Sequence, residues 1–137
     1  MKKYMTKLNL LVGMSFLFLV GCSGTNLSEA FNQEEVIQQA KETIRIINNE
    51  DSQSLLEMST VQMKAGLNED VLEQIYAAIK EAGEFESFED ISVAGDKDKS
   101  TEEEYAVAVV NTKYENKKIT YTITFSSQMK LAGLYYK

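Results

Sequence analysis

The spacing of hydrophobic residues changes at Gly83, and this change limits the folds that the chain can adopt. Before Gly83, apolar residues recur at three- and four-residue steps, which is the period of an amphipathic helix. After Gly83 they recur at every second residue, which is the period of a strand with one covered face. Helices followed by strands predict an α+β domain in which the helices pack on the apolar face of a sheet.

Three helices are expected before Gly83. The first starts after Asn32 and the second after Asp51 or Ser52, because these side chains are good N-caps. The third starts after Asn68 and ends near Gly83, a residue suited to a helix stop. The expected apolar face of the first helix consists of Val36, Ala40, Thr43, Ile44 and Ile47, and that of the third consists of Val71, Leu72, Ile75, Tyr76 and Ile79.

Four strands are expected after Gly83, over residues 88–95, 105–114, 118–128 and 131–136. The segments between the last three strands are short and turn-like, so we expect an antiparallel meander. The third strand has the clearest pattern, in which apolar residues alternate with hydroxyl residues. Its expected covered face is Ile119, Tyr121, Ile123 and Phe125, and its expected wet face is Thr120, Thr122, Thr124 and Ser126.

Aromatic residues on these elements are candidates for the wall of a pocket between the helices and the sheet. The candidates are Tyr76, Tyr105, Tyr121 and Phe125, and the phenol hydroxyls of the three tyrosines would orient a ligand. Aromatic residues at helix and strand periods are also typical of a filled core. We expect most of this volume to be filled, with at most a shallow pocket near Tyr105 and Tyr121.

The first residues have the pattern of a secretory leader. Lys2, Lys3 and Lys7 precede an apolar run over residues 8–20, and no acidic residue lies before the end of this run. As a helix the run spans roughly 20 Å, whereas a membrane-spanning helix crosses about 30 Å. The run therefore fits the apolar region of a signal peptide.

The leader ends in Leu19-Val20-Gly21-Cys22, which includes the only cysteine in the chain. These residues resemble the lipobox of bacterial lipoproteins. The resemblance implies that Cys22 carries a diacylglyceryl group and becomes the first mature residue, so that the protein is anchored by lipid on the outer face of the cytoplasmic membrane. We therefore expect a signal peptide over residues 1–21, the lipidated cysteine and a short tether over 22–27, and one α+β domain over 28–137.

The domain also resembles a known family. Helices followed by a curled antiparallel sheet is the element order of the nuclear-transport-factor-like, or cystatin-like, superfamily. More narrowly, the chain resembles the bacterial domain of unknown function 3887 family in "GEFESF", "YAVAVVNTKYEN", "YTITF" and "LAGLYY", which lie between residues 83 and 136. The resemblance implies helices packed on a curled, four-stranded antiparallel roll with a pocket between them. It implies no activity, because these residues belong to strands and turns.

Composition excludes several kinds of function. The net charge of −7 argues against binding to nucleic acid. The chain contains no histidine, which removes histidine metal ligands and every Ser-His or Cys-His nucleophile. The acidic stretch from Asp96 to Glu104 starts like a calcium loop, but Thr101 stands where the loop needs glycine and Val107 where it needs glutamate. We expect neither a metal nor a cofactor.

Three functions remain open. The first is a non-enzymatic, membrane-anchored module that binds a small ligand or a partner. The second is an accessory partner of a membrane or envelope complex, which docks through the second or the last strand. The third is an enzyme of the isomerase or hydratase kind that uses a carboxylate and a tyrosine, with Asp90 or Glu104 beside Tyr105 or Tyr121 as candidates. The third requires a buried acid that faces a cavity.

Overall fold

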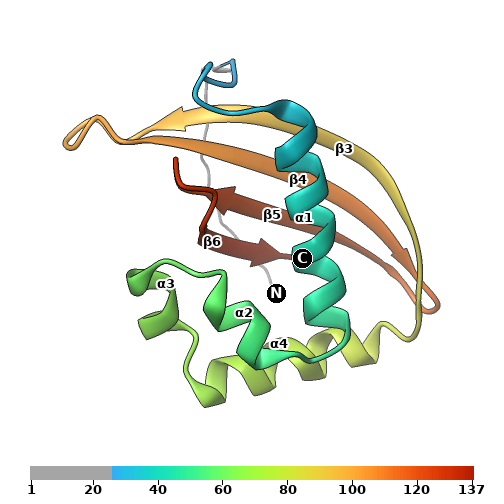
Figure 1. Ribbon diagram of the computed structural model, residues 1–137. Helices are drawn as coiled ribbons and strands as arrows, with labels where there is room; N and C mark the ends of the chain where they lie inside the picture. The colour runs from blue at the N-terminus through green and yellow to red at the C-terminus, as the bar shows by residue number, and fades with distance from the viewer. Residues whose placement is uncertain (1–25) are drawn as a thin grey trace, which may run out of the picture.

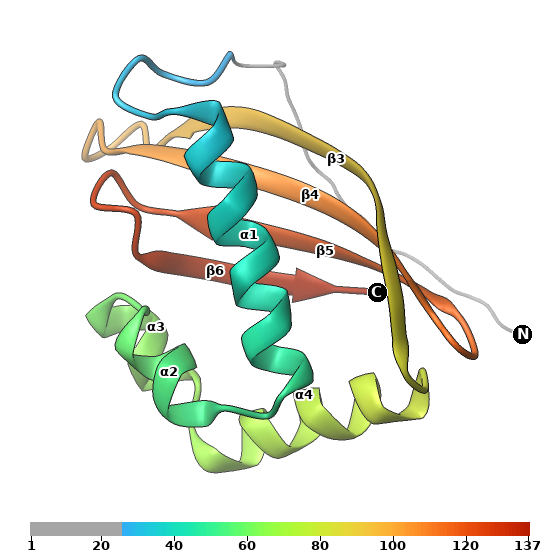
Figure 2. The same ribbon diagram turned by 45° about the vertical axis from the view of Figure 1, so that its right-hand side comes forward.

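A computed structural model describes residues 26–137, which form helices on one face of an antiparallel sheet (Figures 1 and 2). The helices are α1 (Gln33–Asn48), α2 (Ser52–Glu57), α3 (Val61–Gly66) and α4 (Glu69–Glu81). The strands are β3 (Phe85–Lys97), β4 (Glu104–Tyr114), β5 (Lys118–Phe125) and β6 (Leu131–Tyr136). The predicted α+β roll is confirmed. The predicted signal peptide and lipid anchor at Cys22 lie outside the described residues.

The long helices begin at the predicted caps. The side chain of Asn32 accepts a hydrogen bond from the backbone nitrogen of Glu35, and Asn68 caps α4 in the same way through Val71. All five residues of the predicted apolar face of α1 are buried. Within residues 26–137, no helix is both long enough and apolar enough to cross a bilayer.

The short helix α3 was not expected from the sequence. It is capped by Thr60, whose side-chain oxygen accepts a hydrogen bond from the backbone nitrogen of Met63. No residue of α3 is buried, so its sequence carries no apolar period from which a helix can be predicted. A local cap, and not core packing, defines where it begins.

The sheet has the order β3-β4-β5-β6 with every neighbouring pair antiparallel, which confirms the predicted meander. The strand β3 is longer than the expected range of 88–95, and its pairing with β4 has two register irregularities. The strand β5 ends at Phe125, and not at residue 128 as expected from the sequence. There the chain turns, with the backbone nitrogen of Ser126 bonded to the carbonyl oxygen of Lys130 and with Met129 in the left-handed region at φ 62°.

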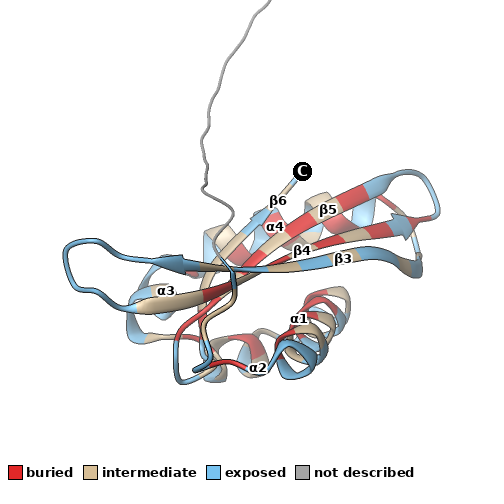
Figure 3. Ribbon diagram, turned by 90° about the horizontal axis from the view of Figure 1, so that it is seen from above, coloured by how far each residue is buried: buried red, intermediate tan, exposed pale blue. Residues whose placement is uncertain are grey.

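The two faces of the sheet differ in burial (Figure 3). Residues that face the helices are buried, among them Ala106, Ala108 and Val110 of β4 and the four predicted residues of β5. Val107, Val109 and the threonines of β5 alternate with them on the outer face and are half-buried. The core therefore lies between the helices and one face of the sheet.

The chain enters the domain beside the end of β3 and the start of β4. Asn26 lies so close to Gly95 that a Cβ atom at this position would stand 2.5 Å from the Asn26 carbonyl oxygen. Nearby, the Ser28 hydroxyl donates to Oε1 of Glu104 over 2.8 Å. Glycine at position 95 thus gives the entering segment its place against the sheet.

Candidate functional site

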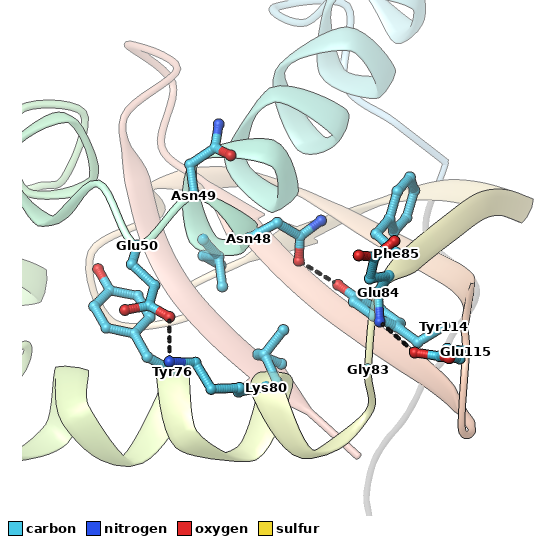
Figure 4. A pocket seen from close by; sticks show the side chains of 12 residues that line it. Asn48, Asn49, Glu50, Tyr76, Lys80, Gly83, Glu84, Phe85, Tyr114 and Glu115 are labelled. Atoms are coloured by element: carbon cyan, nitrogen blue, oxygen red, sulfur yellow. Dashed lines mark hydrogen bonds and ion pairs between the residues drawn. The ribbon is translucent and has the colours of Figure 1, made fainter.

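An open groove of about 600 Å³ lies at the opposite end of β3 from Gly95 (Figure 4). The end of α1, one side of α4, the start of β3 and the end of β4 form its walls. Its principal lining residues are Asn48, Glu50, Tyr76, Lys80, Glu84, Phe85, Tyr114 and Glu115. Volumes of this size accommodate small ligands.

A chain of hydrogen bonds leads from the core to this groove. The Tyr114 hydroxyl donates to Oδ1 of Asn48 over 2.6 Å, and it lies 2.7 Å from the Tyr121 hydroxyl. Because Tyr114 gives its one proton to Asn48, the buried Tyr121 hydroxyl is the donor to Tyr114. The amide nitrogen of Asn48 points away from Tyr114 (Figure 4) and is a donor available to the groove.

Burial holds both tyrosines in the neutral form. It raises the pKa of Tyr121 above the ordinary value, and the hydrogen bond that Tyr121 donates to Tyr114 raises it further. Burial also raises the pKa of Tyr114, although the hydrogen bond that it accepts from Tyr121 opposes this effect. Both phenols therefore act as hydrogen-bonding groups and not as bases at neutral pH.

Carboxylates dominate the charge of the groove. Nζ of Lys80 lies 3.6 Å from a carboxylate oxygen of Glu50, so these two charges offset one another. Glu84 and Glu115 are exposed, and the Glu84 backbone nitrogen donates to Oε1 of Glu115 over 3.4 Å. These two carboxylates leave the groove with negative charge, which favours a ligand with a cationic group.

An aromatic wall stands beside these charges. The rings of Phe85 and Tyr114 meet edge to face, with centroids 5.4 Å apart and an interplanar angle of 77°. Gly83 precedes this wall with a φ of 89°, a conformation that glycine adopts without strain. The turn at Gly83 brings the start of β3 beside the end of β4, where Phe85 pairs with Tyr114.

The structure separates the four aromatic residues that the sequence nominated. Tyr76 lines the groove, half-buried, with its hydroxyl 2.9 Å from Oγ of Ser52. Tyr121 lies behind the groove and reaches it through Tyr114, whereas Phe125 is buried in the core. Tyr105 lies on the outer face and lines a different depression. Strand alternation explains this placement, because the next residue along β4 faces the helices.

The candidate enzyme residues lie outside the groove. Asp90 is exposed, and Glu104 is half-buried beside Ser28. Desolvation raises the pKa of Tyr105, with a further contribution from the charge of Glu103. Every other aspartate and glutamate within residues 26–137 is exposed. No described carboxylate therefore has the buried environment that a general base of this kind requires.

The acidic loop closes on itself. Oδ1 of Asp98 accepts hydrogen bonds from the hydroxyl and the backbone nitrogen of Ser100. These bonds hold the pKa of Asp98 below its ordinary value, and the bond from the Ser100 hydroxyl has the larger effect. In the part of the chain that the structure describes, no three His, Cys, Asp or Glu side chains are grouped to hold a metal ion.

Sequence reasoning did not nominate Asn48, Glu84, Phe85 or Glu115 for the site. Asn48 and Tyr114 are 66 positions apart and are joined only by the packing of α1 on the sheet. The signal that was available is Gly83, since a glycine between a helix and a strand marks a turn at which side chains from both can converge. Its neighbour Glu84 lies in the groove.

The fold and the groove define a class of small α+β roll, in which helices cover one face of a four-stranded meander and an open groove lies at one end of the sheet. The chain belongs to the family described as protein of unknown function (DUF3887), whose model matches residues 40–134. The match includes every principal residue of the groove.

The chain is also similar to a solved structure, the NMR structure of a protein from Ruminococcus gnavus ATCC 29149. The two are 24% identical, with a TM-score of 0.72 over 81% of this chain and 96% of that chain. At this identity the likeness shows the fold alone. The comparison with curated proteins gave no match.

Proposed function

We propose that the chain is a non-enzymatic, extracytoplasmic lipoprotein that is anchored through Cys22 and binds a small ligand in the groove. The observation that carries the binding function is the hydrogen-bond chain that runs from the buried Tyr121 through Tyr114 to Asn48 at the groove. A chain of this kind fixes the direction of the Asn48 amide before a ligand arrives.

The groove favours an amine-bearing ligand. Glu84 and Glu115 attract a cationic group, and the Asn48 amide nitrogen donates to an oxygen of the ligand. The apolar part of such a ligand packs on the rings of Phe85 and Tyr114. Since a cation stacked near aromatic rings gains further attraction, these features act together.

Three properties support a binding role over catalysis. The chain has no histidine, and burial raises the pKa values of Tyr114 and Tyr121, which moves these two phenols away from use as bases near neutral pH. Glu104 and Tyr105 are adjacent on β4, so their side chains point to opposite faces of the sheet. This arrangement lends no support to a carboxylate and tyrosine pair acting on one substrate.

The anchor is tested with Cys22→Ser in the full chain. We expect the protein to move from the membrane fraction to the medium, or to stay as an uncut precursor, because the acyl chains that hold it have lost their attachment atom. Wild-type protein fractionated in parallel is the control. A variant that is still cut at position 22 and still sediments with membranes in high salt would rule out the lipid anchor.

The groove is tested by native mass spectrometry of protein extracted from the cells that make it. We expect a bound amine-bearing molecule that is lost in Glu84→Gln and Glu115→Gln, because both changes remove charge and keep shape. Glu34→Gln is the matched control, since this exposed residue lies at the other end of α1.

Two results would contradict the proposal. One is a bound molecule that both groove variants retain. The other is a turnover activity that is lost when a single groove carboxylate or tyrosine is changed.

A further inference from the structure

The last strand, β6, lies at one edge of the sheet, and another segment of the chain covers only its first residue. The Leu131 backbone nitrogen donates to the Met58 carbonyl oxygen over 2.7 Å, and the Thr60 backbone nitrogen donates to the Leu131 carbonyl oxygen over 2.9 Å. Ser59 and Leu131 thus form an isolated parallel bridge, after which the chain turns into α3. This edge already accepts an extended segment at one end.

Further along β6 the backbone groups that point outward belong to Leu134 and Tyr136. The Lys137 backbone nitrogen donates to the carbonyl oxygen of Thr120 in β5 over 3.1 Å, and the Thr120 backbone nitrogen donates to the Lys137 carbonyl oxygen over 2.9 Å. Because backbone groups alternate in direction along a strand, those of Tyr136 and Leu134 point to the open edge. Each of these two residues offers one N–H and one C=O.

The two edges of the sheet differ in the features that prevent edge pairing. The other edge strand, β3, carries acidic residues along its length and has two register irregularities. Charges and bulges of this kind block the addition of a further strand. By contrast β6, with the sequence LAGLYY, has no charged residue. Only its first part is bulged, next to Phe125.

Two exposed apolar side chains lie along this edge, one near each end of β6. Within residues 26–137, the large hydrophobic residues that stand out as exposed are Val61 at 78% and Tyr135 at 60%. Val61 follows directly on the segment that is bonded to Leu131, and Tyr135 lies on β6. A groove of about 290 Å³ runs beneath the edge, lined by Met63, Leu67, Val71, Ile75, Leu134 and Tyr136. Figure 2 shows β6 at the border of the sheet with α3 and α4 below it.

We propose that β6 pairs antiparallel with β6 of a second copy of this chain, around a two-fold axis between the two Tyr135 residues. In this register Leu134 lies opposite Tyr136 of the second copy, and Tyr136 lies opposite the second copy's Leu134. Both are hydrogen-bonded pairs, so every outward group of the two residues gains a partner. The two Tyr135 side chains meet as a non-hydrogen-bonded pair on the outer face, where side chains approach most closely.

A second copy fits this edge because β6 is self-complementary, as a two-fold interface requires. The strand β6 ends at Tyr136, which lies opposite Leu134 of the other copy, so the paired strand does not overlap the stretch that Met58 and Thr60 occupy. The apolar side chains of Leu134 and Tyr136 continue the groove into that of the second copy. The result is one continuous sheet with the helices of both copies on the same face.

The pairing is tested by cysteine cross-linking of the full chain in membranes of the cells that make it. A cysteine at position 135 lies next to its own copy at about 4.5 to 5.5 Å between Cβ atoms, near disulfide geometry. We expect an oxidant to convert the Tyr135→Cys variant into a disulfide-linked dimer of twice the mass. A reductant should return this dimer to the single chain. Wild type controls for Cys22. Thr122→Cys, opposite Tyr135 on β5 and one strand inward, controls for random collision.

Amide hydrogen exchange gives an independent readout. We expect slow exchange at the Leu134 and Tyr136 amides in the wild type, and fast exchange in Tyr135→Lys, where like charges meet at the axis. Thr122→Lys adds the same charge to the same sheet face and should leave both amides slow.

Three results would overturn the proposal. The first is fast exchange at both amides in the wild type, and the second is equal cross-linking at positions 122 and 135. The third is a cross-linked product whose mass is not twice that of the chain, which would mean that the edge accepts a different polypeptide.

Discussion

The direction of the tyrosine hydrogen bonds predicts that two similar substitutions have unequal costs. Tyr121→Phe removes a donor, while the Tyr114 hydroxyl keeps its own acceptor on Asn48. Tyr114→Phe instead leaves the Tyr121 hydroxyl without an acceptor, and Tyr121 is fully buried, with 0% of its surface exposed. A buried polar group without a partner loses its hydration and regains nothing.

The magnitudes follow from this difference. Loss of an ordinary intramolecular hydrogen bond costs about 0.5 to 1.5 kcal/mol, which is the expected cost of Tyr121→Phe. A buried group left unsatisfied costs about 1 to 3 kcal/mol, which is the expected cost of Tyr114→Phe. The double variant should cost less than the sum of the two, because it also removes the hydroxyl that Tyr114→Phe leaves stranded.

Urea unfolding followed by circular dichroism measures these free energies. Tyr76→Phe is the matched control, because its hydroxyl bonds to Ser52 and its side chain is only half-buried, so a small loss is expected. A cost for Tyr121→Phe that equals or exceeds that for Tyr114→Phe would refute the donor direction assigned here. Costs that add without coupling would refute the network.

Three further predictions concern stability. Ile123→Ala should cost about 2 to 5 kcal/mol because the side chain is buried, whereas half-exposed Thr122→Ala should cost no more than about 0.5 kcal/mol; equal losses in urea unfolding would contradict the assignment of faces. Folding raises the pKa of Tyr121, so keeping this phenol protonated stabilises the folded state. That stabilisation is complete below the unfolded-state pKa of about 10, and above it the free energy of unfolding falls by about 1.4 kcal/mol per pH unit. Unfolding measured over a pH series should therefore show a flatter decline in Tyr121→Phe than in the wild type. Gly83→Ala, at a φ of 89°, should lower the unfolding free energy by about 1 to 2 kcal/mol, and an unchanged value would mean that the turn tolerates a side chain.

Much of the fold could be predicted because periodicity records burial. The apolar face of α1 repeats at helical spacing over the whole helix, and every residue predicted for it is buried. The alternation along β5 likewise identified its covered face. The helix α3 could not be found in this way, since it buries none of its residues. Periodicity thus predicts elements that pack on the core and misses those that do not.

The candidate site could be predicted only in part, because its residues meet through packing between distant segments. Tyr76 was nominated and lines the groove, whereas the residues around it were not. Tyr105 was grouped with Tyr121 by residue type, although the alternation of β4 places it on the other face. A composition argument identifies aromatic residues, but the parity of each strand decides which of them can meet.

The strand order of the sheet has a consequence for how the domain folds. Each strand pairs with its neighbour in the sequence, so the sheet can grow through successive hairpins with short loop closures. The apolar face of α1 packs on β3 and β4, which lie far after α1 in the sequence. This side of α1 is therefore covered by the sheet only once β3 and β4 have paired. The hydrogen bonds that join Leu131 to Met58 and Thr60 close a much longer loop than any hairpin of the sheet, so they should form last. We therefore expect the contacts of β6 with the segment before α3 to contribute little to the folding transition state, so that their loss mainly speeds unfolding.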